Sequence, residues 1–309
     1  MSFELTILGS SAALPTSKRF PTAHLLHAGG RFFLIDCGEG TQIRLRQFGI
    51  NPSKIQDIFI SHLHGDHVFG LFGLLSTLGM MGRKLPLKLY GPFVLKEFMQ
   101  SYYSFFGPLP FELIITSPAE DVDFIFESDK LSIKAIPLTH RTPAYGYLFR
   151  EKQKPLNVIK EQIEAYGLGI ADLVKVKRGE DFVTESGLLV PNSQLTLPPF
   201  HQRSYAYLSD TMFKPELAEL VEGVDLLFHE ATFSEKDKKL AALTQHSTAR
   251  EAATLAKLAG VKKLLIGHFS SRYKEPALLE NEAKEIFEDT VAVSDGDIYS
   301  IPPERVSGE

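Results

Sequence analysis

The feature that most constrains this chain is a cluster of four side chains of metal-binding type within six residues. They are His62, His64, Asp66 and His67. The apolar segment Ile58–Ile60 leads into the cluster, and the apolar pattern Val68–Leu78 leads out of it. At the end of an extended strand, the first two histidines would point to the same side. Gly65 would permit a sharp turn, which lets the last two side chains aim at a second point nearby.

A single histidine in such a turn is usually an ordinary surface residue. Four ligand-type residues at this spacing after a strand instead predict a dinuclear metal site. Neutral imidazole and carboxylate groups suit zinc, manganese or iron. The N-terminus of the helix that begins near Val68 adds positive potential, which favours a phosphate group.

Composition restricts the chemistry further. Cys37 is the only cysteine in 309 residues, so a metal must be held mainly by His, Asp and Glu. The formal net charge of −5 disfavours nonspecific wrapping of DNA, because general nucleic-acid binders are usually basic. We see neither a signal peptide nor an apolar run of about 20 residues, as a membrane span would need. A cytoplasmic protein without a membrane partner is expected.

Short apolar runs alternate with helical patterns in the first and last thirds of the chain, which indicates an α/β protein. The expected strands are Leu5–Leu8, Phe32–Ile35, Ile58–Ile60, Phe111–Ile115, Leu131–Ile136, Tyr205–Leu208, Leu226–Phe228, Lys263–Ile266 and Thr290–Val293. The expected helices are Gly40–Phe48, Val68–Leu78, Val94–Tyr103, Pro215–Val221, Thr248–Leu258 and Pro276–Phe287. The region Val122–Tyr147 predicts consecutive strands and hence mixed sheets. Thr248 and Glu251 resemble a capping box, with Gly260 just past the helix end.

Residues 150–198 differ from the rest, because Lys, Glu, Gly and Pro are frequent and hydrophobic periodicity is poor. We interpret this segment as an insertion that projects from a single domain spanning residues 1–309. It contains the basic cluster Lys175, Lys177 and Arg178, which can contact phosphates or can be a solvated turn.

Four ligands cannot complete two metal ions, so further ligands are needed. Three candidates each stand just past the end of an apolar strand, namely His140, Asp210 and His268. Each alone could be a strand-end residue without a role. Their shared placement makes convergence on one rim of the fold a reasonable expectation.

The segment His62–His67 carries the signature of the metallo-β-lactamase superfamily, and the chain resembles its ribonuclease Z branch over nearly its whole length. The segments that carry this resemblance occur in the family's order: Leu8–Pro15, Phe33–Gln42, Leu208–Thr211, His229–Phe233, His246–Thr248 and Gly267–Tyr273. The metal signature marks only the superfamily. The pair His-Glu-Ala-Thr and His-Ser-Thr is far more specific.

The resemblance implies a four-layer αββα sandwich with two zinc ions per subunit, for which manganese or iron could substitute. It implies that His62, His64 and His140 bind one ion, that Asp66, His67 and His268 bind the other, and that the Asp210 carboxylate bridges both. Two metal ions about 3.5–4 Å apart can activate a water molecule and hold a phosphodiester. The implied activity is removal of the 3′ trailer from precursor tRNA after the discriminator base.

Catalytic roles follow from the same comparison. We expect Asp66 to accept the proton of the nucleophile in addition to binding metal. His246 is the candidate donor to the leaving 3′ oxygen, with Glu230 orienting it. Asp36 is expected to support a metal-binding histidine from behind. Arg272 is a candidate phosphate contact, with a surface salt bridge as the alternative.

The insertion occupies the place of the family's flexible arm, which grips tRNA, and family enzymes are homodimers. Both properties are implied by resemblance alone. The main competing function is that of a metallo-β-lactamase-fold phosphodiesterase acting on small cyclic or modified nucleotides. A β-lactamase or thioester hydrolase would share the same fold and metal signature. A non-enzymatic chain would instead be an RNA-binding scaffold with an inactive site.

Overall fold

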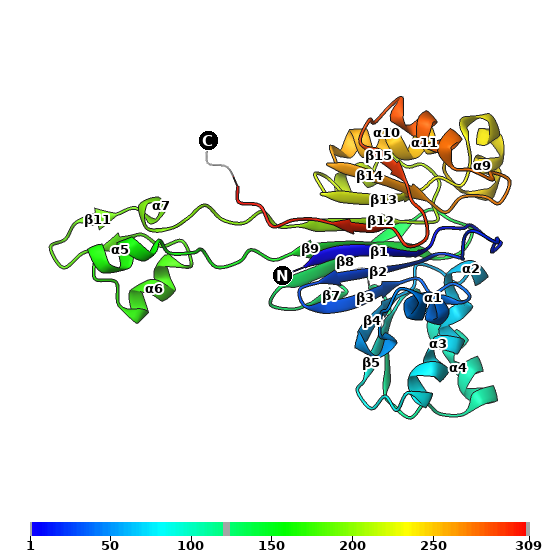
Figure 1. Ribbon diagram of the computed structural model, residues 1–309, viewed down its shortest axis with the longest axis horizontal. Coiled ribbons are helices and arrows are strands. Elements are labelled where there is room, and N and C mark those ends of the chain that lie inside the picture. Colours follow the sequence, from blue (N-terminus) through cyan, green and yellow to red (C-terminus); the bar gives the residue numbers. More distant parts are fainter. Residues whose placement is uncertain (1, 120–123, 307–309) are drawn as a thin grey trace. The chain divides into compact units, whose positions relative to one another are not determined.

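The computed structural model describes residues 2–119 and 124–306, and the chain divides into two compact units (Figure 1). Unit 1 comprises Met1–Arg150 and Ser204–Ile301, and unit 2 comprises Glu151–Arg203 and Pro302–Glu309. The expected strand region beginning at Val122 starts outside the described residues, and its described part contributes to three consecutive strands.

The first sheet of unit 1 has seven strands in the order β16-β1-β2-β3-β4-β5-β6. Their bounds are β1 Phe3–Gly9, β2 Ala23–Ala28, β3 Arg31–Ile35, β4 Ile55–Phe59, β5 Leu87–Tyr90, β6 Leu113–Thr116 and β16 Ile298–Ser300. Strands β16, β1, β2 and β3 pair antiparallel, whereas β3 to β6 pair in parallel. The sheet is therefore mixed, as the sequence predicted.

The second sheet of unit 1 has the order β15-β14-β13-β12-β9-β8-β7. Its strands are β7 Phe126–Glu127, β8 Leu131–Leu138, β9 Ala144–Glu151, β12 Ser204–Leu208, β13 Leu226–Glu230, β14 Lys263–Gly267 and β15 Thr290–Ala292. Strands β12 to β15 are parallel, and β9 pairs antiparallel to β12. The parallel strands end at the same edge, which is where ligands gather in such sheets.

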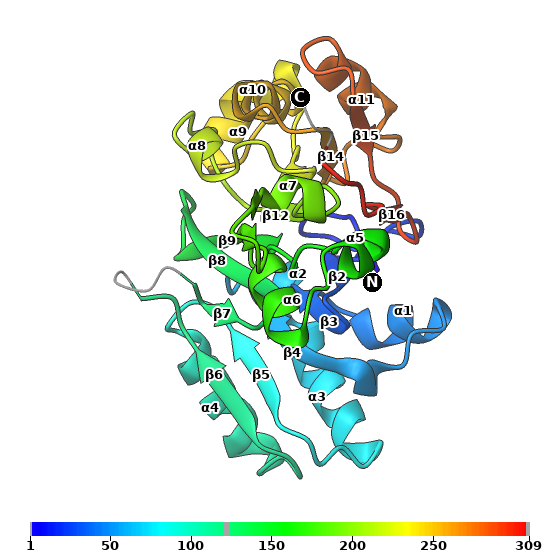
Figure 2. The same ribbon diagram turned by 90° about the vertical axis from the view of Figure 1, so that its left-hand side faces the viewer.

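Three apolar layers hold unit 1 together. Aromatic and aliphatic side chains of both sheets pack between them, among them Phe33 and Phe59 from the first sheet and Phe149 and Phe228 from the second. Helices α1 Thr41–Gln47, α3 Gly70–Met80 and α4 Leu95–Phe106 cover the outer face of the first sheet. Helices α8 Leu217–Leu220, α10 Ala249–Ala259 and α11 Ala277–Lys284 cover that of the second. Figures 1 and 2 show this αββα arrangement, which confirms the expected fold.

The helix predictions hold with shifted ends. The capping box of α10 is confirmed, because the Thr248 side chain accepts from the Glu251 amide and Glu251 accepts from the Thr248 amide. Gly260 ends this helix in the left-handed region. The expected helix Val68–Leu78 is instead two helices, α2 Gly65–Val68 and α3. Strands β2, β5 and β16, helix α9 Lys238–Thr244 and the 3-10 turns Pro52–Lys54 and Glu235–Asp237 were not predicted.

Unit 2 contains short elements around a small core of its own. They are α5 Lys160–Ala165, α6 Ile170–Val176, β10 Phe182–Val183, β11 Leu189–Val190 and α7 Asn192–Leu195. Leu168, Val176, Val190 and Leu195 are buried together. Helices this short give little periodicity in the sequence, which explains why none was predicted here.

Candidate metal centre

The seven candidate ligands all follow strand ends or begin the helix after one. His62 and His64 follow β4, and Asp66 and His67 lie in α2. The other three come from the second sheet: His140 follows β8, Asp210 follows β12, and His268 follows β14. Since the two sheets pack face to face, residues more than 200 positions apart, such as His67 and His268, meet at one place.

Three histidines and one carboxylate oxygen form the first group. His64 Nδ1 lies 2.9 Å from His62 Nε2 and 3.2 Å from His140 Nε2. Asp210 Oδ2 lies 3.6 Å from His62 Nε2 and 3.9 Å from His140 Nε2. His64 thus faces the group with Nδ1, whereas the other two rings use Nε2.

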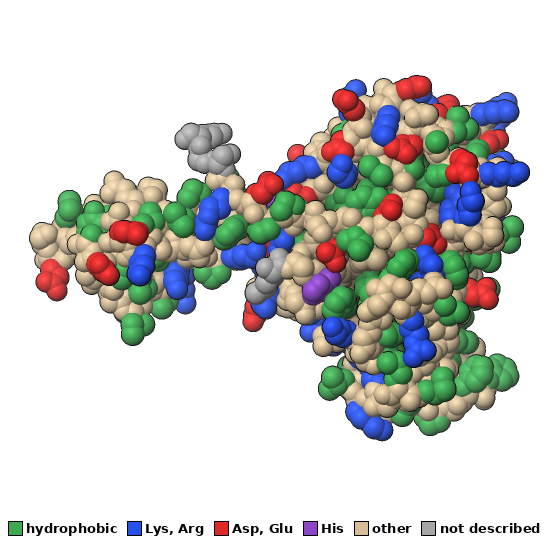
Figure 3. Space-filling view, viewed as in Figure 1, with side chains coloured by type: hydrophobic (Ala, Val, Ile, Leu, Met, Phe, Trp, Pro, Cys, Tyr) green, Lys and Arg blue, Asp and Glu red, His purple; other side chains and the backbone are tan. Residues whose placement is uncertain are grey.

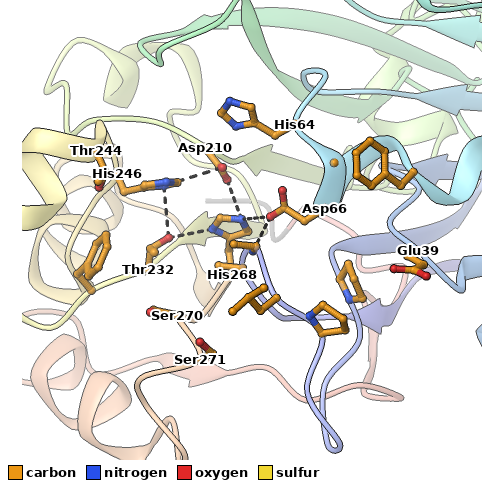
Figure 4. Close-up of a pocket in the computed structure, with 18 of the residues that line it drawn as sticks. Glu39, His64, Asp66, Asp210, Thr232, Thr244, His246, His268, Ser270 and Ser271 are labelled. Carbon is orange, nitrogen blue, oxygen red and sulfur yellow. Dashed lines mark hydrogen bonds and ion pairs between the residues drawn. The ribbon is translucent and has the colours of Figure 1, made fainter.

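The second group has two histidines and two carboxylates. His268 Nε2 lies 3.2 Å from His67 Nε2, 3.3 Å from Asp66 Oδ2 and 3.1 Å from Asp210 Oδ1. Asp210 therefore turns one oxygen toward each group. Figure 4 shows Asp210 and Asp66 both approaching the His268 ring.

Both groups fit divalent metal ions. Ligand atoms about 2.0–2.1 Å from a tetrahedral zinc ion lie about 3.3 Å from one another. The distances given above are close to this value. All four ligand atoms of the first group lie within 4.8 Å of one another, and so do those of Asp66, His67 and His268 in the second. Two carboxylates with five imidazoles also make a donor set that suits zinc, manganese or iron.

Hydrogen bonds on the far side of the rings hold three of the histidines. His67 Nδ1 donates to Asp36 Oδ2 (2.7 Å), His140 Nδ1 to the Gln245 carbonyl (2.9 Å) and His268 Nδ1 to Thr232 Oγ1 (2.8 Å). In a neutral imidazole, each bond would leave Nε2 without a proton and able to bind a metal ion, as metal-binding histidines require. The predicted supporting role of Asp36 agrees with its contact to His67.

Asp36 accepts three further hydrogen bonds. They come from the Ser61 amide (2.7 Å), the Ser61 hydroxyl (2.8 Å) and the Tyr207 hydroxyl (2.5 Å). Tyr207 belongs to β12 of the second sheet, so this buried carboxylate joins the two sheets behind the candidate ligands. No sequence signal pointed to Tyr207, because only the packing of the sheets brings it to Asp36.

His246 and Glu230 lie beside Asp210, which the two groups share. His246 Nδ1 donates to Glu230 Oε1 (2.7 Å) and lies 3.9 Å from Asp210 Oδ2. Burial by itself would lower the pKa of His246, but the charges of Glu230 and Asp210 outweigh it and raise the pKa to about 9. Burial would raise the pKa of Glu230, yet the charge of His246 and its hydrogen bond lower it.

Backbone strain is concentrated at this centre. Among the described residues, four that are not glycine have φ between 52° and 58°: Ala13, Asp36, Gln245 and His268. His268 is a candidate ligand, and the other three each hydrogen-bond to one: the Ala13 amide to Asp66 Oδ2 (2.7 Å), Asp36 to His67, and the Gln245 carbonyl to His140. Such conformations persist where surrounding contacts enforce them, and they cluster at functional sites.

A cavity of about 700 Å³ opens over the ligands. His64, Asp66, Asp210, His246 and His268 reach it from the elements described above (Figure 4). Sequence reasoning missed several of its other lining residues, notably Thr232, Phe69 and Arg141. Thr232 could have been found from its place two residues after Glu230, since its hydroxyl also donates to Glu230 Oε2 (2.6 Å).

None of the basic residues singled out from the sequence is among the described residues that line the cavity. Arg272 Nε donates to Ser270 Oγ (3.2 Å), and its guanidinium lies 3.6 Å from Asp237 and 5.1 Å from the centre of the Phe233 ring. Lys175, Lys177 and Arg178 are exposed at the end of α6 in unit 2. Both signs of charge are present on the visible face of this unit (Figure 3).

Curated relatives resemble the chain over almost all of its length. A protein named ribonuclease Z from Bacteroides thetaiotaomicron is 44% identical over 291 residues, covering 94% of this chain and 92% of the relative. Another of that name, from Parabacteroides distasonis, is 44% identical over 297 residues, with 95% and 97% covered. A family model described as "Anti-Pycsar protein Apyc1" matches residues 3–99, which is less than half of the chain.

Solved structures share the fold. Human tRNase Z, short form, superposes with a TM-score of 0.70 and 27% identity, covering 97% of this chain and 99% of that one. A metallo-β-lactamase fold protein from Bacillus subtilis has the same TM-score at 18% identity.

None of the helices in the described part of the chain combines the length and apolar character that a bilayer crossing requires.

Proposed function

This chain belongs to the ribonuclease Z family, and from this premise we propose that it removes the 3′ trailer from precursor tRNA by cutting after the discriminator base. It is a metal-dependent endoribonuclease of the metallo-β-lactamase fold. The proposed cut leaves a 3′ hydroxyl on the tRNA and a 5′ phosphate on the trailer. The observation that carries the proposal is the position of Asp210, whose two oxygens face separate ligand groups beside the His246–Glu230 pair.

The metal proposal is two zinc ions per subunit. His62, His64 and His140 would hold one ion; Asp66, His67 and His268 would hold the other; Asp210 would bridge both. Manganese or iron can occupy the same donors. When bound, the ions supply the Lewis acidity that activates a water molecule and stabilises charge on the phosphodiester.

Three side chains are proposed to take part in proton transfer. Asp66 is proposed to accept the proton of the attacking water in addition to binding metal. His246 is proposed to donate a proton to the leaving 3′ oxygen, since it lines the cavity beside Asp210. Glu230 would hold the imidazole of His246 in the donating orientation through the Nδ1 hydrogen bond.

Positive charge would position the RNA backbone. Arg272 remains a proposed phosphate contact, although Asp237 already attracts its guanidinium. Arg141 is the only lysine or arginine among the described residues that line the cavity, and it is exposed. We therefore add Arg141 to the proposed phosphate contacts.

The decisive experiment is incubation of the purified protein with one 3′-extended tRNA precursor, with and without a chelator. We expect a single cut after the discriminator base, loss of cutting with the chelator, and recovery when Zn²⁺ or Mn²⁺ is restored. An intact precursor under every divalent ion tried would refute the proposal. Hydrolysis of 3′,5′-cyclic nucleotides by the same sample, without cutting of the precursor, would favour the competing phosphodiesterase function.

Unit 2 is proposed to bind the tRNA through Lys175, Lys177 and Arg178. Replacing all three by alanine should raise KM for the precursor and flatten the dependence of binding on salt, because each lost phosphate contact reduces that slope by about 0.7–0.9. Lys160→Ala, at an exposed position of α5 outside the cluster, is the control. Unchanged KM and slope in the triple variant would remove the cluster from the RNA interface.

The homodimer and the cytoplasmic location remain predictions. Light scattering of the purified protein tests the first, with a mass of two chains expected. A precursor tRNA substrate is consistent with the second.

A further inference from the structure

Phe69 is an exposed aromatic side chain beside the proposed metal ligands. It follows the last residue of α2, and the residue is 66% exposed although its ring is wholly apolar. The same residue lines the cavity, together with His64, Asp66 and His246. A single exposed ring is ordinary on a protein surface, but this one lines the cavity beside the candidate ligands, where a substrate could cover its apolar face.

The Phe69 ring packs directly against the backbone of Gly65. A Cβ atom added at Gly65 would lie only 2.3 Å from Cε2 and 2.6 Å from Cζ of Phe69. The sequence interpretation assigned Gly65 to a sharp turn, but its φ is not in the left-handed region. The space taken by the Phe69 ring gives a better reason for a glycine at this position.

This packing contact holds the Phe69 ring close to the candidate metal ligands. Gly65 stands between His64, which faces the first ligand group, and Asp66, which faces the second. A ring held on Gly65 is therefore held next to the place where the scissile phosphodiester must lie, if the proposed function is correct. The nucleotides on either side of that bond are the parts of the substrate within its reach.

We propose that Phe69 stacks on a nucleobase directly adjacent to the bond that is cut. The inference rests on the proposed function and deepens it by naming a substrate contact. Every base has a flat apolar face, so stacking on an aromatic side chain tolerates any base at the contacted position. Single-stranded RNA ends are commonly recognised in this way, with unstacked bases laid on aromatic rings.

The test combines a change in the protein with a change in the RNA. Phe69→Leu keeps an apolar side chain but removes the aromatic face, and Phe69→Tyr keeps that face. Phe93→Leu is the matched control, because Phe93 is 64% exposed and is not among the described residues that line the cavity. Each protein is assayed on an intact precursor and on four precursors that lack one base, at the two positions on each side of the cut.

For the wild-type protein, we expect loss of one particular base to lower kcat/KM by about 5- to 150-fold, the range for one stacked base. Phe69→Leu should lower kcat/KM on the intact precursor by a similar factor, and the two changes together should cost no more than either alone. Phe69→Tyr and Phe93→Leu should behave like the wild type.

Several outcomes would overturn the proposal. One is full activity of Phe69→Leu on the intact precursor, and another is penalties that multiply independently at all four positions. A loss of bound metal or of subunit association in Phe69→Leu would assign Phe69 to packing or to a subunit interface instead. A wild-type protein that cuts the precursor but shows no such coupling refutes only the stacking contact, whereas one that leaves the precursor intact refutes the proposed function as well.

Discussion

Nδ1 of His246 donates a hydrogen bond to Glu230 Oε1 across 2.7 Å, and this bond occupies one of the two ring nitrogens. Nε2 is the remaining nitrogen. The buried Glu230 also accepts from the Thr211 amide (3.0 Å) and the Thr232 hydroxyl (2.6 Å), so its carboxylate is held from three directions. The imidazole consequently has one orientation that its surroundings support.

If His246 donates the proton to the leaving 3′ oxygen, His246→Ala should slow single-turnover cutting by about 10²- to 10⁴-fold, the usual size of general acid catalysis. Replacing the leaving oxygen by sulfur should largely restore the rate, because a thiolate leaves without protonation. Glu230→Gln should show a smaller loss with the same rescue. An equal loss on the oxygen and sulfur substrates would show that His246 acts in some other way.

Asp66 is assigned two tasks, and removing it should abolish cutting. Asp66→Ala is expected to show no measurable turnover of the precursor, together with a reduced metal content by elemental analysis. Asp66→Asn keeps one oxygen donor but cannot accept a proton, so it should retain more metal and still be inactive. Asp129→Ala, at an exposed position, provides the control. Turnover by Asp66→Ala with metal still bound would contradict both assignments.

The thiol of Cys37 should be unreactive in the folded protein. The residue is fully buried, and this burial raises the pKa of its thiol to about 12. At pH 8 the reactive thiolate would then be roughly one part in ten thousand. We expect no reaction with Ellman's reagent under native conditions and one thiol per chain after denaturation. Rapid native labelling would mean that the strand end next to Asp36 opens readily.

The capping box of α10 should contribute measurably to stability. Thr248→Ala removes the hydroxyl that accepts from the Glu251 amide, and such losses cost about 0.5–2 kcal/mol of the free energy of unfolding. Thr254→Ala in the same helix removes a hydroxyl that only bonds back to the Arg250 carbonyl. That control should be near neutral by chemical denaturation. Equal losses in both variants would argue against a capping effect.

Much of the fold could be predicted because its strands are apolar runs bounded by turn residues. The expectation that His140, Asp210 and His268 share one rim followed from their places after such runs, and the structure brings them together. Strand β2 was missed because His24 and His27 interrupt its apolar pattern, although His24 is fully buried.

Other features depend on contacts that no local pattern encodes. Tyr207 and Asp36 are 171 positions apart and meet only because the sheets pack. The exposed ring of Phe69 and its contact with Gly65 are equally invisible in the predicted helical pattern Val68–Leu78, which runs through Phe69. In unit 2, helices of six and seven residues are too short for periodicity to reveal them.

The ligand groups draw on both sheets, and this has a consequence for any fragment of the chain. A piece ending before β8 would keep His62, His64, Asp66 and His67 but lack every donor from the second sheet. Bound metal ions would join the two sheets. The melting temperature should therefore rise in proportion to the logarithm of the free metal concentration. Removing the metal should therefore weaken the contact between the two sheets at the place where the candidate ligands meet.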